Sequence, residues 1–380
     1  MIWYIKRQLN QFNAFLGGIV LKKKIRVIVV DDSAFNRQSI AAMLESSPDI
    51  EVVDSVADGR EAIRSVTTYK PDIITLDLEM PNMDGFTFLR WLMANRPTPV
   101  LVISSQSDTK SVFTALDLGA VDFLAKPTKR ISNEIQGIKH DLLKKVEIIS
   151  NLPIEKITSR VRILEKREIE EAPYQSIKAV KASKGILRGD IDLVAIGSST
   201  GGPPALQSII SVLPANFPAS VAISQHMPAG FTKYFSERMD KNAKVDVKEA
   251  ENGDIVRAGA VFISPGGYHM TFRRDSDQEV KINLKKRLPS DLYTPSVDIM
   301  MTSAAEIFGK KVLGVILTGM GNDGKIGMRE IRNRNGQTIA ESEETAVVFG
   351  MPGEAIKDGT IDKVLPLPEI PEEIIKRCSK

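Results

Sequence analysis

Short apolar runs alternate with helix-like stretches in two separate blocks of this 380-residue sequence. In the first block the strand-like runs are Ile25–Val30, Ile50–Val56, Asp72–Leu76, Pro99–Ser104 and Val121–Ala125. In the second block they are Leu193–Ile196, Val221–Ser224, Val261–Ser264 and Val312–Thr318. Strands that alternate with helices pair in parallel, and the helices cover both faces of the sheet. The pattern therefore predicts an α/β fold with two doubly wound parallel-sheet domains, the first five-stranded and the second Rossmann-like.

The stretch between the two blocks has the composition of a linker. It contains Pro153, a charge-dense run at Glu165–Glu171, and Pro173. We predict an N-terminal extension over residues 1–24, a first domain over 25–147, a linker over 148–189 and a second domain over 190–380. Within the second domain we also predict a β-hairpin over Met270–Leu284, in which residues 273–277 separate the two strands.

The composition excludes several classes of function. The formal net charge of +3 is too small for a protein dominated by nucleic-acid electrostatics. The single cysteine, Cys378, rules out a disulfide framework and a cysteine-based metal site, and it favours the reducing cytoplasm. No apolar run approaches the roughly 20 residues of a membrane-spanning helix, so we expect no stable membrane insertion.

The first residues show a pattern of their own. Apolar residues from Ile2 to Ile19 recur at spacings of three and four, which is typical of an amphipathic helix lying on a membrane or a partner. Polar residues interrupt any apolar core, so the segment is not a secretory signal. A terminal extension without function is the simpler interpretation. Gly17-Gly18 fits a translated ribosome-binding site, and we hypothesise that the native protein starts at Val20 or Leu21.

Polar residues follow the strands of the first block, at the edge where such sheets bind ligands. Asp31 and Asp32 follow the first strand and Asp77 follows the third, so three carboxylates should converge. Each one alone fits a helix cap or a loop. Together they would repel one another without a cation, and Mg²⁺ prefers such oxygen ligands. Ser104 ends the fourth strand and Lys126 follows the fifth, and a carboxylate that faces a lysine and a hydroxyl suits attack on a phosphoryl group.

The first block closely resembles the receiver domains of response regulators. The resemblance rests on Val29–Ser33, Leu76–Gly85 and Leu124–Pro127. It implies that Asp77 is the phosphoacceptor, and that Mg²⁺ is bound by Asp32, Asp77, the Glu79 carbonyl and, through water, Asp31. It also implies that Ser104 and Lys126 bind the phosphoryl group and that Phe123 is a switching aromatic.

The second block carries a glycine-rich corner at Gly197–Gly202, between its first strand and a helix start. Such a turn presents the Ser199 hydroxyl at the carboxyl end of a strand, as an activated nucleophile requires. A serine nucleophile needs a base, and the sequence has three histidines. His226 follows the next strand, which favours it over His269, a residue that also fits a structural imidazole. His140 lies on a polar stretch and is interpreted as a surface residue.

The acid that orients the base should also stand at a strand end. Asp323 follows the strongly apolar strand Val312–Thr318, whereas Asp298 fits the first turn of a helix, where carboxylates are favoured anyway. Asp323 also lies within Gly319–Gly324, which fits the Gly-x-Gly-x-x-Gly pattern of dinucleotide-binding domains. We reject that interpretation because Asp323 would repel a pyrophosphate and little chain remains for a cofactor domain.

Taken together, the motifs of the second block resemble the catalytic domain of the chemotaxis methylesterase family CheB. These motifs are Ile196–Gly202, Gln225–Pro228, Pro265-Gly266, His269-Met270, Pro295–Asp298 and Leu317–Gly324. The resemblance implies a Ser199–His226–Asp323 triad, with the Met320 backbone N–H and Thr200 as oxyanion and positioning groups. The chain order Ser, His, Asp differs from that of the α/β-hydrolases. No cofactor is expected in the esterase site.

This resemblance implies a phosphorylation-activated protein-glutamate methylesterase that also deamidates receptor glutamines in chemotaxis adaptation. Its partners would be methyl-accepting chemotaxis receptors and the histidine kinase of the chemotaxis system, with no nucleic acid. We expect the unphosphorylated first domain to cover the active-site face. Two alternatives stay open at this point: a phosphorylation-dependent receptor-binding module with an inactive site, and a methylesterase that serves a non-chemotaxis receptor array.

Overall fold

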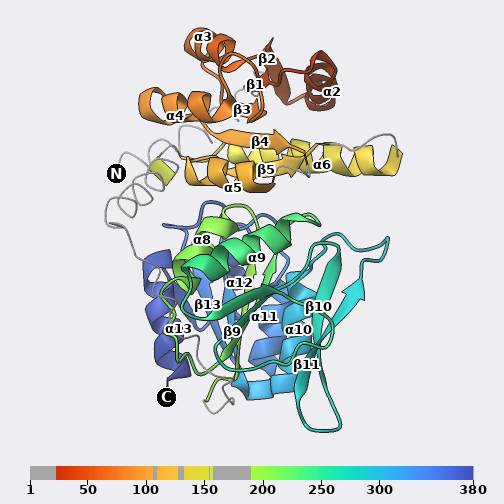
Figure 1. The fold of residues 1–380 in the computed structure, drawn as a ribbon, viewed down its shortest axis with the longest axis vertical. Coiled ribbons are helices and arrows are strands. Elements are labelled where there is room, and N and C mark those ends of the chain that lie inside the picture. The colour runs from red at the N-terminus through yellow and green to blue at the C-terminus, as the bar shows by residue number, and fades with distance from the viewer. Residues whose placement is uncertain (1–22, 106–108, 127–131, 154, 157–189, 380) are drawn as a thin grey trace, which may run out of the picture.

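The computed structural model describes residues 23–105, 109–126, 132–153, 155–156 and 190–379. The predicted N-terminal extension, the hypothetical native start and most of the predicted linker lie outside these residues. The chain forms two α/β domains that stack end to end along the long axis of the molecule (Figure 1). None of the helices in the described ranges combines the length and the apolar character needed to cross a membrane.

The first domain is a five-stranded parallel sheet in the order β2-β1-β3-β4-β5. Its elements are β1 (Ile25–Val30), α2 (Ala34–Glu45), β2 (Ile50–Val56), α3 (Gly59–Tyr69), β3 (Ile73–Leu76), α4 (Gly85–Asn95), β4 (Val100–Ser104), α5 (Thr109–Asp117), β5 (Asp122–Ala125) and α6 (Ser132–Ile149). The strands are buried because helices cover both faces of the sheet. The strand order reverses direction at β1, so the carboxyl ends of β1 and β3 lie side by side.

The second domain is a seven-stranded parallel sheet in the order β14-β13-β12-β6-β7-β9-β8, with a separate antiparallel hairpin. Its strands are β6 (Leu193–Ser198), β7 (Ser220–Gln225), β8 (Asp246–Glu249), β9 (Ala260–Ile263), β10 (Tyr268–Arg274), β11 (Val280–Lys286), β12 (Val312–Ile316), β13 (Gln337–Glu341) and β14 (Lys363–Leu365). Its helices are α8 (Gly202–Ile210), α9 (Phe231–Asn242), α10 (Val297–Phe308), α11 (Lys325–Asn333), α12 (Met351–Lys357) and α13 (Ile370–Cys378). The predicted class of two doubly wound parallel-sheet domains is confirmed.

Three strands of the second sheet were not predicted from the sequence. Two of them, β8 and β14, form the two edges of the sheet and carry partly exposed charged residues. Edge strands bury one side only and often carry charges, which weakens the hydrophobic pattern. The third, β13, pairs with β12 and β14 and was missed although it is largely buried.

The hairpin exists, but the prediction that residues 273–277 separate its strands was wrong. Arg273 and Arg274 belong to β10 and pair with Lys281 and Val280 of β11. The turn comes later because Asp275 starts it: its backbone N–H donates to the Glu279 carbonyl over 2.8 Å. In Figure 1 this turn points away from the first domain.

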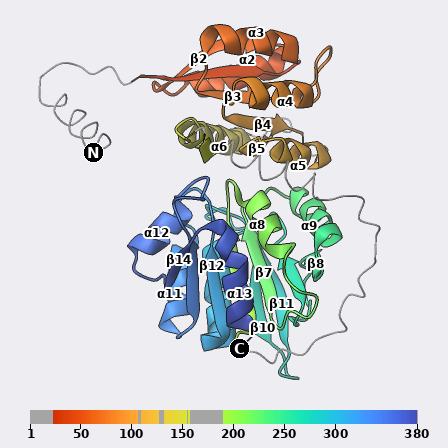
Figure 2. The same ribbon diagram turned by 90° about the vertical axis from the view of Figure 1, so that its left-hand side faces the viewer.

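The two domains meet through α5 and β5 of the first domain and α8 and α9 of the second (Figures 1 and 2). Phe113 stacks on Phe235, with ring centroids 5.4 Å apart and planes at 2°. Phe123 packs against Phe231 at 4.7 Å between centroids. Because aromatic rings are large, these pairs bury much apolar surface and join the two hydrophobic cores.

Candidate functional site

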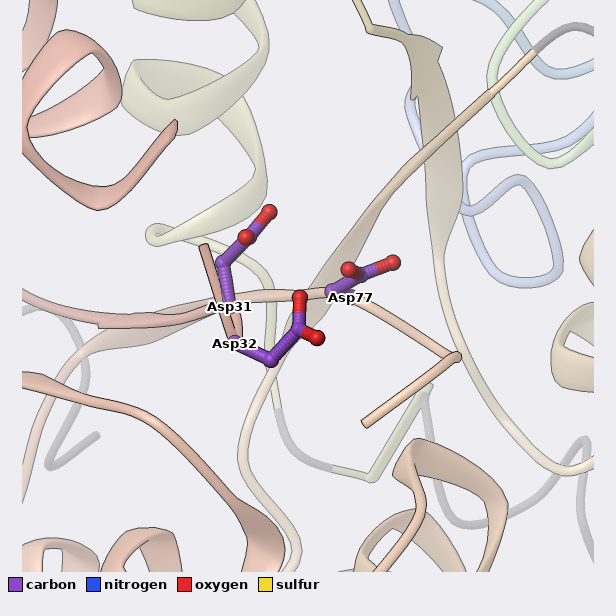
Figure 3. Close-up of side chains that lie close together, drawn as sticks. All are labelled: Asp31, Asp32 and Asp77. Carbon is purple, nitrogen blue, oxygen red and sulfur yellow. The ribbon is translucent and has the colours of Figure 1, made fainter. Parts of the chain in front are cut away.

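An acidic cluster forms where β1 and β3 end. One carboxylate oxygen from each of Asp31, Asp32 and Asp77 lies within 4.8 Å of the others. Figure 3 shows Asp31 and Asp32 on one segment and Asp77 on a neighbouring one. Asp31 and Asp77 are buried, whereas Asp32 is exposed. Three converging oxygen donors with one side open to water fit Mg²⁺, which keeps several of its waters when bound.

Lys126 lies against the same cluster. Its Nζ is 2.6 Å from Asp77 Oδ2 and 2.9 Å from Asp31 Oδ2. Burial raises the pKa of Asp77, and the charge of Asp31 adds to this, so the lowering effect of Lys126 is outweighed. The pKa of Lys126 is raised: burial lowers it, but its two carboxylate partners more than compensate. The cluster therefore contains a buried carboxylate, Asp77, that is paired with a lysine, Lys126.

Three further residues were predicted for this site: Ser104, Glu79 and Phe123. Ser104 is buried at the end of β4, and its carbonyl accepts the Lys126 N–H over 2.7 Å. The side chain of Glu79 is exposed and lies outside the acidic cluster. Phe123 is buried on β5 and packs against Phe231 of the second domain. The acidic cluster and the domain interface are therefore connected through β4 and β5, which pair with each other.

Ser199 stands on the tight corner between β6 and α8. Gly201 adopts a φ of +81°, which favours glycine, and a Cβ on Gly202 would lie 2.0 Å from Gln225 Oε1. The Ser199 N–H donates to the Thr318 carbonyl over 3.0 Å. The backbone is thus held between the ends of β7 and β12, the two strands that flank β6.

His226 and Asp323 are brought together from positions 97 residues apart. His226 Nε2 lies 2.7 Å from Asp323 Oδ2. Since Nε2 faces the carboxylate, Nδ1 is the nitrogen left to accept a proton. Within the described ranges no hydrogen bond joins Ser199 Oγ to this ring. The His226 N–H donates to the carbonyl of Ser198, the residue before Ser199, over 3.1 Å.

The N-terminus of α10 holds Asp323. Its carboxylate accepts the N–H groups of Val297 over 2.7 Å and Asp298 over 2.9 Å, and the Ser296 hydroxyl over 3.0 Å. Burial raises the pKa of Asp323, but the hydrogen bond and charge of His226, together with these N–H donors, lower it further, and the net pKa is below its ordinary value. Asp323 is therefore kept ionised, which suits an acid that orients a histidine.

His269 and Asp298, the alternatives to His226 and Asp323, form other hydrogen bonds. His269 Nε2 lies 2.8 Å from Asp291 Oδ2, and its Nδ1 accepts the Ser296 N–H over 3.2 Å, so both ring nitrogens are engaged. Asp298 lies in the first turn of α10 and accepts the N–H groups of Gly324 and Gly327 over 2.9 and 2.8 Å. Asp298 thereby stabilises the position of the loop that carries Asp323.

Two backbone donors lie beside Ser199. Among the described residues, the N–H groups of Thr200 and Met320 donate to no protein acceptor. The loop that carries Met320 passes close to the nucleophile corner: a Cβ on Gly319 would lie 2.9 Å from Ser199 Cβ. Free N–H groups at such a corner are suited to bind a developing oxyanion.

The first domain covers this corner. Thr200 Oγ1 donates to Asp122 Oδ2 of β5 over 2.5 Å, and Lys145 of α6 pairs with the same carboxylate. Lys144 of α6 donates to the Tyr293 hydroxyl over 3.3 Å. The Tyr293 ring stacks on His226, with centroids 4.4 Å apart and planes at 4°. The exposed fractions of Ser199 and Thr200 are only 7% and 3%, so access to the corner is closed.

Three contributors to the site were missed in the sequence. Gln225 is buried; its amide donates to the carbonyls of Ser199 and His226 over 2.9 and 3.0 Å and so ties the corner to the base. A polar residue ending a buried strand directly before His226 was a usable signal. Tyr293 and Asp122 gave none, because their roles depend on contacts with distant segments.

Comparisons with known proteins show which family this sequence matches. Residues 27–135 match the response regulator receiver domain, and residues 194–374 match the CheB methylesterase model. The protein-glutamate methylesterase/protein-glutamine glutaminase 3 of Geobacter sulfurreducens is 51% identical, over 94% of this chain and 98% of its own. The chain belongs to the CheB methylesterase family. The resemblance stated from the motifs is thus confirmed, and the dinucleotide-binding interpretation of Gly319–Gly324 is not needed.

A second full-length relative and one solved domain are also similar to this chain. The protein-glutamate methylesterase/protein-glutamine glutaminase of Pyrococcus abyssi is 41% identical over 93% of this chain and 94% of its own. The crystal structure of the Thermotoga maritima CheB methylesterase catalytic domain is 45% identical and covers 49% of this chain and 98% of that one, with a TM-score of 0.48. As in this family, the chain consists of a receiver domain followed by a methylesterase domain.

Proposed function

We propose that this CheB-type protein hydrolyses glutamyl methyl esters on chemoreceptors, deamidates receptor glutamines, and is activated by phosphorylation of Asp77. The observation that carries the proposal is the His226–Asp323 pair, 2.7 Å apart, at the ends of strands that flank the Ser199 corner. A nucleophile, a base and an ionised acid at neighbouring strand ends are the groups that acyl transfer requires.

Acylation starts when Ser199 Oγ attacks the ester carbonyl of the substrate. His226 Nδ1 takes the serine proton, and Asp323 stabilises the imidazolium through Nε2. The N–H groups of Thr200 and Met320 are placed to bind the oxyanion. The tetrahedral intermediate collapses, His226 returns the proton to the leaving oxygen, and methanol departs from the acyl-enzyme.

Deacylation repeats these steps with water. His226 takes a proton from the water that attacks the acyl-enzyme, then returns it to Ser199 Oγ, and the product is a glutamate side chain. A glutamine substrate follows the same course, except that ammonia leaves in place of methanol. The same pair of residues therefore supports both activities of the family.

The receiver domain controls access to this site. In the proposal Asp77 attacks a phosphohistidine, with Lys126 and Ser104 as partners for the phosphoryl oxygens. Asp31, Asp32, Asp77 and the Glu79 carbonyl would hold Mg²⁺, which when bound neutralises charge on the transferring phosphoryl group. Phosphorylation would act through β4 and β5 on Phe123 and release the contact between Asp122 and Thr200. The partners are then methyl-accepting chemotaxis receptors and a histidine kinase, in the cytoplasm.

Methanol release from methylated receptor membranes tests the proposal. With Mg²⁺ and a small phosphodonor, the full chain should release methanol faster than without them. Ser199→Ala should abolish release, whereas Ser208→Ala, a serine of α8 that bonds only to its own helix, should not. A Ser199→Ala variant with undiminished release would overturn the mechanism, and one that still restored adaptation in cells would favour the receptor-binding alternative. Asp77→Asn should remove the stimulation and keep the basal rate.

A further inference from the structure

The segment that follows β11 lies beside the candidate active site. It runs from Arg287 to Tyr293, and Tyr293 stacks directly on His226. In Figure 1 the hairpin forms one side of the methylesterase domain, and its turn lies at the end remote from the receiver domain. The chain leaving β11 is therefore at the end of the hairpin nearer the receiver domain and the catalytic corner.

Hydrogen bonds hold this segment in place. Asp291 Oδ2 accepts the Leu288 N–H over 2.6 Å and lies 2.8 Å from His269 Nε2. His269 is buried, with an exposed fraction of 3%. The segment is thus anchored through a buried histidine, and its outward side chains keep a defined position.

Two of those outward side chains are leucines. The exposed fraction is 61% for Leu288 and 90% for Leu292, which immediately precedes Tyr293. Scattered exposed leucines need no explanation. These two stand four residues apart on one anchored segment, and Leu292 directly precedes the residue that stacks on the candidate base.

Basic residues continue this surface. Lys285, Lys286 and Arg287 are exposed, and in the described part of the chain none of them forms an ion pair with a neighbouring carboxylate. The neighbouring carboxylate Asp291 pairs with His269. The hydrogen bond from the Leu288 N–H lowers the Asp291 pKa most, and the charge of Arg287 is among the further causes. Lys285 and Lys286 have no such carboxylate partner among the described residues. Positive charge and apolar side chains therefore lie on one short segment, 285–292. Its exposed basic and leucine residues are called the Leu292 edge: Lys285, Lys286, Arg287, Leu288 and Leu292.

We propose that the Leu292 edge docks the acidic amphipathic helix of the receptor that carries the glutamyl ester. This inference rests on the proposed function, in which the substrate is a helix bearing glutamyl side chains. Its carboxylates complement the three basic residues, and its apolar face complements the two leucines. The edge is continuous with the catalytic corner through Tyr293.

Docking at this edge does not require the site to open. Leu292 is 90% exposed in the same structure in which the receiver domain covers Thr200. The receptor therefore binds before phosphorylation, and the subsequent release of the corner permits reaction. Changes at the edge should act on KM for the receptor and leave the chemical steps intact.

Steady-state kinetics with two substrates test the docking. The full chain, with Mg²⁺ and a small phosphodonor, is assayed on a methylated soluble receptor fragment and on the small ester N-acetylglutamate γ-methyl ester. The double variant Leu288→Ser/Leu292→Ser should raise KM for the receptor fragment about tenfold with kcat unchanged, because two leucine side chains would no longer be buried against the receptor helix. Its kcat/KM on the small ester should not change. The control Val212→Ser/Val364→Ser, at two exposed valines elsewhere, should match the wild type on both substrates.

The contribution of the basic residues of the Leu292 edge is tested with the double variant Lys285→Glu/Lys286→Glu. This variant should raise KM for the receptor fragment, and the wild-type KM should rise with salt as the charges are screened.

If the wild type releases methanol from the receptor and the leucine variant has an unchanged KM, the docking inference is wrong and the proposed function stands. If the wild type cleaves the small ester but releases no methanol from the receptor, the proposed function fails and the docking inference fails with it.

Discussion

At the scale of single residues, the carboxylate of Asp323 is held by four hydrogen-bond donors. Its two oxygens accept donors from His226, Ser296, Val297 and Asp298. All of these donors require an unprotonated carboxylate. An amide in this place would turn an N–H toward a donor and leave a buried group unsatisfied.

Asp323→Asn should therefore lower kcat for methanol release by about 10⁴, because the imidazole loses its orienting acceptor. Asp275→Asn, on the exposed hairpin turn, is the matched control and should keep the wild-type rate. Circular dichroism of the variant checks that the fold is retained. A folded Asp323→Asn protein with near-normal kcat would exclude the assigned role.

Asp298 is the second carboxylate of this cluster. Burial raises its pKa from the ordinary value of 3.8 to about 6, and the charge of Asp323 adds to the effect, against N–H bonds from Gly327 and Gly324. Between these two pKa values the folded state binds more protons than the unfolded state, so this residue's contribution to stability falls as pH rises through that range.

Asp298→Asn should remove that contribution. The difference in free energy of unfolding between wild type and variant should change as pH rises from about 4 to about 6, with the wild type losing stability relative to the variant. Urea unfolding at a series of pH values measures it. Parallel curves for the two proteins across this range would show that the pKa of Asp298 is not raised.

At the scale of elements, the loop after β12 shapes the catalytic corner. Gly319 lies so close to its neighbours that a Cβ would be 2.3 Å from Met351 Sδ and 2.9 Å from Ser199 Cβ. Its carbonyl accepts the N–H groups of Gly350 and Met351 over 3.1 and 2.9 Å. The loop is thus clamped between the nucleophile corner and the start of α12.

Gly319→Ala should push this loop away from Ser199. We expect it to destabilise the domain by about 1–3 kcal/mol, as overpacking does, and to lower kcat by displacing the Met320 N–H. Gly353→Ala, within α12 and facing only a Phe349 ring at 3.2 Å or more, should leave kcat unchanged. Thermal unfolding and methanol release measure the two effects, and an active, fully stable Gly319→Ala protein would refute this packing argument.

At the scale of the whole molecule, the domain interface combines apolar and ionic contacts. Phe113 and Phe123 supply the apolar part, and Arg238 of α9 pairs with Asp117 of α5 over 2.5 Å. Lys156 donates to the carbonyls of Glu343 and Ala346 over 2.6 and 2.7 Å. The closed arrangement is the sum of such contacts, so weakening one should shift the population toward the open state.

Arg238→Ala should raise the unphosphorylated methylesterase rate by up to about fivefold, since a partly exposed ion pair contributes about 0.2–1 kcal/mol. Arg257→Ala is a close control, because Arg257 pairs with Asp246 at 2.8 Å and similar exposure within one domain. The charge swap Asp117→Arg/Arg238→Asp should restore the low basal rate. An Arg238→Ala protein with unchanged basal activity would mean that this pair does not hold the domains closed.

The sequence by itself determined the two parallel sheets, because their buried strands are strongly apolar and polar residues follow them at one edge. The same local pattern pointed to Asp31, Asp32, Asp77, Ser199 and His226. It placed the hairpin turn two residues too early. It also passed over the edge strands β8 and β14, whose hydrophobic pattern is weaker, and the inner strand β13. Only the tertiary structure decided how the site is closed. The Thr200–Asp122 hydrogen bond joins residues that are 78 positions apart and lie in different domains. Such a contact depends on how the elements pack, so no pattern in the sequence predicts it.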